Sequence, residues 1–128
     1  MVIVDTSVWI QFMRARNSLE HLELARLIRA GQAVMVGPVL AEILQGARSQ
    51  EEYERLFFDL TALPYAETSR ETWAEVGLLS YQLRREGSPV GVVDLTIAAL
   101  ALEYGHGVYT LDKHFLRIPG LLLHRAEL

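Results

Sequence analysis

Four acidic side chains lie in or beside apolar stretches, where a lone carboxylate is unfavourable. Asp5 ends an apolar run, Glu42 interrupts one, Asp94 lies between two, and Asp112 follows one. Burial of an unpaired carboxylate costs roughly several kcal/mol, and the sequence has no matching set of four bases with apolar neighbours. Convergence of the acids on a divalent cation would remove this cost. The pattern therefore indicates metal-dependent phosphodiester chemistry.

The types of residue available narrow the choice of cation. Two unit negative charges 4 Å apart repel by about 4 kcal/mol at an effective dielectric constant of 20, so clustered carboxylates must take up protons or bind a cation. Oxygen ligands without cysteine suit Mg²⁺ or Mn²⁺ better than Zn²⁺. Two such ions can activate a water molecule and stabilise the leaving oxygen of an in-line displacement.

Each acid also has a purely structural interpretation. Asp5 is a possible helix N-cap, and Asp94 would be stabilised by the dipole in the first turn of its helix. Asp112 is a possible cap for the short turn that follows it, and Glu42 a solvated residue on the rim of a small helix. For any one acid this interpretation is favoured, but three aspartates that follow buried elements at the mouth of one sheet together favour a metal site.

Apolar runs and capping signals predict the elements that position these acids. We expect buried strands at 2–5, 33–36, 108–110 and 121–123, and a short edge strand at 62–65 that Pro64 weakens. Helices are expected to begin near positions 7, 18, 37, 49, 69 and 92 and to end near glycines or polar turns. The fifth of these helices places Trp73, Val76, Leu79 and Leu83 on one face.

This alternation predicts an α/β fold, a three-layer α/β/α arrangement with a central, mainly parallel sheet of four to five short strands in one domain, residues 1–128. Ligands bind such sheets beyond the carboxyl ends of the strands. Asp5 and Asp112 follow two of the expected strands, and the loop 88–91 can bring Asp94 to the same edge.

Composition excludes several classes of protein. The 128 residues are 51% hydrophobic and include no cysteine, which excludes disulfides and thiolate zinc or iron–sulfur sites. No apolar run approaches a membrane span, and no basic leader precedes an apolar stretch, so we expect a soluble cytoplasmic protein. With a net charge of −4 and a pI near 5.5, any contact with nucleic acid must be local, with the metal supplying positive charge.

Four segments in fixed order carry a resemblance to a known family. They are Val-Ile-Val-Asp-Thr-Ser-Val-Trp-Ile (2–10), Gly-Pro-Val-Leu-Ala-Glu-Ile-Leu-Gln-Gly (37–46), Val-Asp-Leu-Thr-Ile-Ala-Ala (93–99) and Tyr-Thr-Leu-Asp-Lys-His-Phe (109–115). Together they resemble PIN-domain endoribonucleases, and most closely the VapC-type toxins of toxin–antitoxin pairs. The resemblance covers nearly the whole chain and implies a Mg²⁺-dependent ribonuclease, with Mn²⁺ a plausible substitute.

The same resemblance implies roles for the acids. Asp5 and Asp94 would bind the main ion, Asp112 would complete the site, and Glu42 would hold a second ion or position the attacking water. Beside them, the hydroxyls of Ser7 and Thr110 would hydrogen-bond the carboxylates or a metal-bound water. The alternatives are helix capping for the serine and ordinary strand preference for the threonine.

Basic residues near the expected sheet mouth are candidates for contacts with RNA phosphates. Arg84 and Arg85 precede the loop to Asp94, and Lys113 follows Asp112. The arginines also occupy a helix C-terminus, where cations are favoured in any case. Of the histidines only His114 falls near the acids, and we expect it to have a surface or turn role.

Adjacent aromatics at Phe57 and Phe58 cannot point the same way on a helix. One is expected to face the core and the other a partner, or both are buried within this subunit. The resemblance implies a homodimer and a cognate antitoxin whose basic C-terminal segment covers the site.

Other functions fit less well. A non-catalytic module could use the acids to bind a basic partner peptide, although the complete acid set argues against it. An aspartyl phosphatase would need an acid in place of Ser7, and a receiver domain would need one in place of Thr6. The sequence does not specify which RNA would be cut.

Overall fold

A four-stranded parallel sheet forms the centre of the computed structural model, which describes residues 1–126. In space the strand order is β3-β2-β1-β4. The strands are β1 (Val2–Val4), β2 (Ala33–Val36), β3 (Tyr65–Ala66) and β4 (Gly107–Tyr109). Every residue of β1 and β2 is buried, which explains why these strands are continuously apolar rather than alternating.

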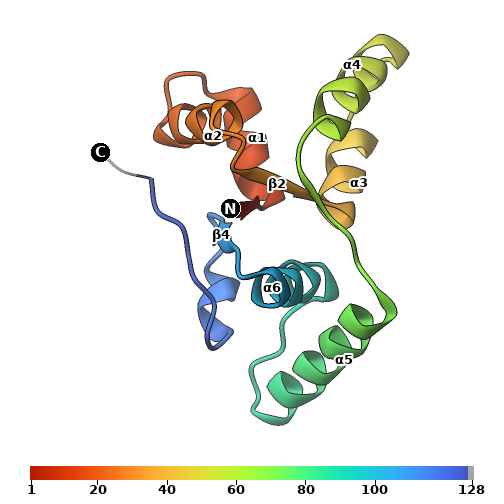
Figure 1. Ribbon diagram of the computed structural model, residues 1–128, viewed down its shortest axis with the longest axis vertical. Helices are drawn as coiled ribbons and strands as arrows, with labels where there is room; N and C mark the ends of the chain where they lie inside the picture. The colour runs from red at the N-terminus through yellow and green to blue at the C-terminus, as the bar shows by residue number, and fades with distance from the viewer. Residues whose placement is uncertain (127–128) are drawn as a thin grey trace.

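Helices connect the strands and cover the sheet. They are α1 (Thr6–Arg14), α2 (Leu19–Arg29), α3 (Gly37–Gln45), α4 (Gln50–Thr61), α5 (Arg70–Arg85), α6 (Val92–Tyr104) and the short 3-10 helix η1 (Lys113–Arg117). In Figure 1, α1 and α2 lie on one side of the sheet and α6 and α5 on the other, while α3 and α4 extend to one side. This arrangement confirms the predicted α/β/α fold with a mainly parallel sheet.

Helix α6 forms much of the core because it packs between the sheet and α5. Seven consecutive residues, Leu95 to Ala101, are buried. Gly105 ends the helix with a φ of 68°, a left-handed conformation that glycine adopts without a steric penalty. No helix among residues 1–126 is both long and apolar enough to span a bilayer.

Side-chain caps set several helix starts. Ser18, Ser49 and Ser69 each accept a hydrogen bond from the backbone N–H three residues later. Before α5, Ser69 and Thr72 form a capping box, in which each side chain accepts a hydrogen bond from the backbone N–H of the other residue.

The structure corrects three sequence-based expectations about elements. Segment 121–123 is not a strand, because only Leu123 forms a bridge, with Val108. The edge strand begins at Tyr65 rather than residue 62, since Pro64 takes part only by accepting a hydrogen bond from Met35 N at 2.7 Å. Trp73 does not join the buried face of α5 and is half exposed.

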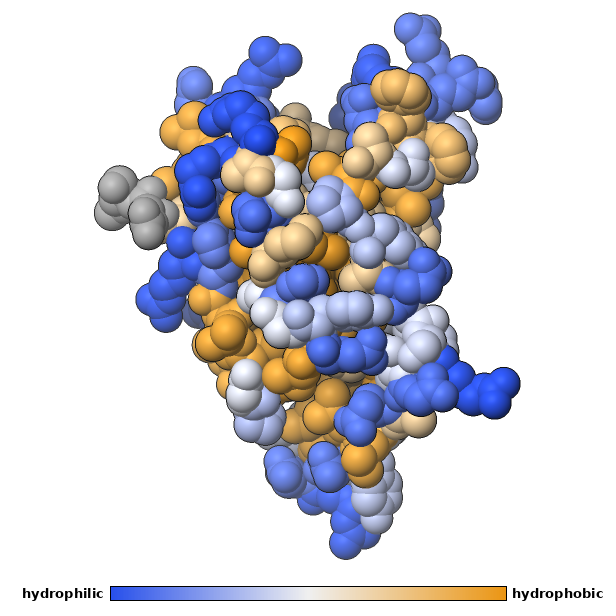
Figure 2. All heavy atoms as spheres, in the orientation of Figure 1, coloured by the Kyte–Doolittle hydropathy of each residue, from blue (hydrophilic) through white to orange (hydrophobic). Residues whose placement is uncertain are grey.

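Helix α4 departs further from expectation. The rings of Phe57 and Phe58 are both exposed, with Phe58 at 76%, so neither ring faces the core and the alternative that buries both within this subunit was wrong. In Figure 2, apolar side chains lie among charged ones where α4 stands, beside a notch that separates it from the α1–α2 side. Helix α4 therefore presents apolar side chains to solvent.

Candidate metal centre

The carboxyl edge of the sheet gathers the predicted acids from separate segments. The parallel register pairs Val4 with Tyr109, so the residues that follow β1 and β4, Asp5 and Thr110, emerge side by side. Asp112 lies two residues beyond and caps η1, and Asp94 is the third residue of α6. The topology therefore brings residues about a hundred positions apart to one place.

Asp5 is held by two hydroxyl groups. Its side-chain oxygen Oδ2 accepts hydrogen bonds from Ser7 Oγ at 2.7 Å and from Thr110 Oγ1 at 2.8 Å. Although Asp5 occupies the N-cap position of α1, its side chain makes no capping bond, and the residue is only 6% exposed. The capping explanation for this acid is therefore wrong.

The two hydroxyls are themselves oriented by the backbone. Ser7 Oγ accepts from Leu111 N, and Thr110 Oγ1 accepts from Asp112 N, each at 3.0 Å. Since each hydroxyl accepts an N–H, its own proton is free to point at Asp5. The arrangement joins β1, α1 and the loop after β4 in one network.

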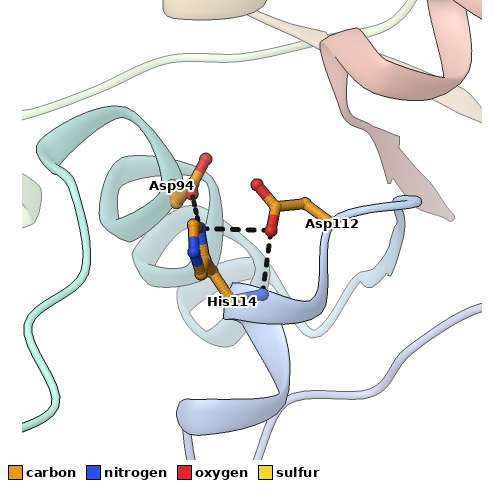
Figure 3. A group of neighbouring side chains, drawn as sticks. All are labelled: Asp94, Asp112 and His114. Carbon is orange, nitrogen blue, oxygen red and sulfur yellow. Dashed lines mark hydrogen bonds and ion pairs between the residues drawn. The ribbon is translucent and has the colours of Figure 1, made fainter.

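Asp94, Asp112 and His114 form the closest group of potential metal ligands among residues 1–126, with one donor atom from each lying within 4.8 Å of the others. His114 Nδ1 is 3.1 Å from Asp112 Oδ1 and 3.7 Å from Asp94 Oδ2, and Figure 3 shows this nitrogen directed at both carboxylates. Asp112 Oδ1 also accepts the backbone N–H of His114 at 2.9 Å.

His114 was the residue whose place sequence reasoning missed. The residue does take part in the turn, because its backbone N–H donates to Asp112 Oδ1. The same turn directs its imidazole ring at the acids. The available signal was the spacing Asp-x-His after a strand, because an aspartate that caps a tight turn places the residue two positions later beside its own carboxylate.

The neighbouring acids also disfavour the charged form of Asp94. Burial raises the pKa of this carboxyl above its ordinary value, and the charges of Asp5, Asp112 and Glu42 raise it further, while His114 lowers it. The Asp94 side chain is 21% exposed, so solvent screens these charges only in part. All four predicted acids therefore act on one electrostatic site.

Glu42 is the most exposed of the four acids. It lies on α3, and its Oε1 accepts a hydrogen bond from Thr6 Oγ1 at 3.0 Å, which fixes it next to the residue that follows Asp5. Both Asp5 and Glu42 lie outside the closest ligand group. They lie at the border of the site and do not belong to the group whose ligand atoms are within 4.8 Å of one another.

The predicted phosphate-binding residues are more dispersed. Lys113 lines a hollow of about 180 Å³ that also includes Asp112 and Arg125. Arg84 and Arg85 are exposed at the end of α5, and the Arg85 guanidinium lies 5.8 Å from the centre of the Tyr81 ring. Within residues 1–126 neither arginine forms an ion pair with the acids.

An α/β/α fold with a parallel sheet and acidic residues grouped at the carboxyl edge of that sheet is the architecture of a nuclease domain. Comparison with known families gives the same class of protein. Residues 2–121 match the PIN domain family. The chain belongs to this family.

Similar proteins are known in several bacteria. The chain is 32% identical over 121 residues to ribonuclease VapC11 of Mycobacterium tuberculosis, covering 90% of this chain and 89% of the relative. It is 30% identical to ribonuclease VapC1 of Rickettsia felis, covering 94% and 92%. Its structure resembles that of VapBC2 from Rickettsia felis bound to a DNA fragment from its promoter, with a TM-score of 0.79, 25% identity and coverage of 97% and 98%.

Proposed function

We propose that this protein is a metal-dependent endoribonuclease that serves as the toxin of a toxin–antitoxin pair. One observation carries the proposal: Asp94, Asp112 and His114 each place one potential ligand atom within 4.8 Å of the others at the carboxyl edge of the sheet. The names of the similar VapC ribonucleases supply the reaction class. The acid site supplies the chemistry.

The donor set fits a divalent cation. Asp94 and Asp112 offer oxygens and His114 offers a nitrogen within one small group, and the excess negative charge of the surrounding acids favours a cation there. These three residues would hold the ion, and the charge of Asp5, which acts on Asp94, would favour its binding. Mg²⁺ is the expected ion, and the imidazole makes Mn²⁺ a good substitute because nitrogen donors suit transition metals.

A bound cation would lower the pKa of a water molecule and offset charge on the phosphate. The protein side chains would orient the ligands and the attacking water and accept the proton. Ser7 and Thr110 hold the Asp5 carboxylate in one orientation, and Thr6 holds Glu42 where it can orient the attacking water and accept its proton. Attack on phosphorus breaks the bond to the 3′ oxygen, leaving a 3′-hydroxyl and a 5′-phosphate.

The decisive experiment compares Asp5→Asn and Asp94→Asn with the parent protein. Cleavage of RNA should be lost in both variants and on addition of EDTA, and the fragments of the parent reaction should carry 5′-phosphates. Full cleavage by either variant in a clean preparation would refute the assignment. Calorimetry with Mn²⁺ separates this enzyme from a module that only binds a basic peptide, because such a module need not bind the metal.

We also propose an antitoxin partner and a homodimer. The similar Rickettsia felis structure is that of VapBC2 bound to a DNA fragment from its promoter. In this chain a hollow of about 590 Å³ between α1, α2 and α4 is lined mainly by apolar residues, among them Trp9, Phe12, Phe58 and Leu63. Such a hollow suits an apolar segment of an antitoxin, whose basic C-terminal end would continue toward the acids.

A further inference from the structure

A second cleft leads away from the acid site. It has a volume of about 510 Å³ and lies between α1, α3 and α4, and Thr6 and Glu42 form one part of its wall. Because Thr6 follows Asp5 directly and hydrogen-bonds Glu42, this wall is continuous with the acid cluster. A polymer that is bound at the acids can therefore extend into the cleft.

Three arginines from three segments line this cleft. Arg14 ends α1, Arg48 lies in the loop between α3 and α4, and Arg55 is on α4. None of them takes part in a salt bridge within residues 1–126. In a protein of net charge −4, three guanidinium groups around one hollow form a local concentration of positive charge.

The charge balance of the cleft favours an anion. Its acidic lining residues are Glu42, which borders the metal site, and Glu52 on α4. The three arginines outnumber them, and a basic peptide would meet net repulsion here. Guanidinium groups bind phosphate oxygens in a bidentate manner, so a phosphodiester backbone is the natural occupant.

The apolar part of the cleft favours a single strand over a duplex. Ile10, Met13 and Leu56 also line it, and Ile10 and Met13 are 38% and 47% exposed. Unpaired bases can pack on such side chains, whereas in a duplex the bases are stacked on one another and shielded.

We propose that the Arg14, Arg48 and Arg55 cleft binds phosphates of single-stranded RNA that flank the bond held at the acids. The inference rests on the proposed ribonuclease function and adds the RNA-binding track to it. This track lies on the Glu42 side of the site, away from Arg84 and Arg85.

The test measures binding separately from cleavage. In an Asp94→Asn background, which removes turnover, the three arginines are changed together to alanine and, in a second protein, to lysine. The probe is a short fluorescein-labelled single-stranded RNA, and its affinity is measured by anisotropy over a range of salt concentrations. The control changes Arg16, Arg29 and Arg70 to alanine, because these exposed arginines line none of the hollows described above and remove the same charge.

The alanine variant should bind the RNA at least about tenfold more weakly than its parent, with the loss spread over all sequences. The slope of log affinity against log salt should fall by about 2, since each phosphate contact on a single strand contributes roughly 0.7. The lysine variant should have a slope close to that of the parent, and the slope of the control variant should equal that of the parent. A duplex of the same sequence should compete poorly.

Other outcomes overturn the inference. They are an unchanged slope in the alanine variant, no recovery with lysine, an equal loss in the control, equal competition by the duplex, or loss of antitoxin binding with RNA binding intact. Circular dichroism confirms that each variant is folded. Arginine-dependent RNA binding in a protein whose parent cuts no RNA would instead sink the ribonuclease proposal and leave the cleft assignment standing.

Discussion

At the residue scale, Asp94 is the clearest sign that the site is built for a ligand rather than for stability. Its carboxyl is partly buried, and three neighbouring acids disfavour its charged form, while only His114 offers compensation. An acid in this position makes the ionised protein less stable when no cation is bound. Proteins keep such groups where function requires them.

Asp94→Asn should therefore raise stability and remove function together. Because the pKa of Asp94 is raised, its cost to the fold appears as the pH rises through the ordinary value of an aspartate and persists at neutral pH. The metal-free variant should melt at a higher temperature than the parent at pH 7, and its RNA cleavage should fall by about 100-fold or more. Adding Mn²⁺ should raise the melting temperature of the parent only.

Thermal melts at pH 7 with EDTA and with Mn²⁺ check this prediction. A lower melting temperature for the metal-free variant would show that Asp94 contributes to the fold rather than straining it.

Thr110→Val should reduce RNA cleavage as well as stability. The substitution keeps the shape but removes the hydroxyl that donates to Asp5 and accepts from Asp112 N. Loss of a group that orients a metal-site carboxylate typically costs about 10- to 100-fold in activity, while the lost hydrogen bonds cost about 1–3 kcal/mol of stability. Rates of RNA cleavage and denaturant unfolding measure the two effects.

Thr61→Val is the matched control for this change, since its hydroxyl donates only to Phe57 O on α4. Equal loss of cleavage in both valine variants would remove the positioning role from Thr110.

At the element scale, residues 122–124 are attached to the fold by backbone hydrogen bonds to β4 and by the contact of His124 with Glu23 of α2. The Glu23 side chain is 5% exposed and accepts from Arg26 Nε at 2.7 Å and Arg26 Nη2 at 2.9 Å. Its Oε2 also lies 2.5 Å from His124 Nε2. Backbone bonds from Val108 to Leu122 and from His124 to Val108 add the sheet contact.

This attachment predicts acid sensitivity in a defined range. The Arg26 guanidinium, aided by His124, lowers the pKa of Glu23 from 4.5 to about 2, although burial opposes the shift. A lowered pKa gives stability that is fully present above the unfolded value of 4.5 and is lost as pH falls toward about 2. The contribution is about 2 kcal/mol, less than the full shift implies because Arg26 is half exposed.

Glu23→Gln should accordingly lower the free energy of unfolding at pH 7 and flatten its dependence on pH between 4.5 and 2. Urea unfolding at several pH values measures both, with Glu20→Gln on the same helix as the control. A variant with the same acid profile as the parent would show that the contact contributes nothing.

Sequence patterns predicted the elements whose burial is uniform. Runs such as 2–4 and 33–36 are apolar throughout because both faces of a parallel strand are covered, and they locate the strand end where Asp5 stands. Sequence patterns did not predict the structure correctly where two conformations or two helix faces are equally compatible with the sequence and tertiary packing selects one of them. The apolar triplet 121–123 resembles a strand, yet only Leu123 pairs, and helical periodicity on α4 cannot tell which face has no neighbour.

The candidate site was predictable to a similar extent. The acids follow from apolar flanks and strand ends, and their grouping follows from the parallel topology. The position of His114 does not, because it depends on a tight turn and on how α6 packs beside it. The arginine cleft could not be predicted from the sequence either. Its three arginines are 34 and 7 positions apart, and only the packing of α1, α3 and α4 brings them together.

At the scale of the whole molecule, exposed apolar side chains mark where a partner is expected. Phe58 is 76% exposed and lines the apolar hollow with Trp9 and Phe12. A ring exposed to this degree contributes little to folding but much to an interface that buries it.

Phe58→Ser should leave the melting temperature and the RNA cleavage rate unchanged and weaken antitoxin binding by about 10- to 100-fold. Calorimetric titration with the cognate antitoxin tests this, with Tyr81→Ser, an exposed aromatic on α5, as the control. Unchanged affinity in the Phe58 variant would place the antitoxin elsewhere.

Met13 and Leu56 line both the apolar hollow and the arginine cleft, so the two depressions share a wall. An antitoxin seated in the first would press on this wall and narrow the second. Inhibition would then work by occlusion of the incoming transcript as well as by capping the acids. The dissociation rate of the protein complex would set how soon the nuclease could engage its target.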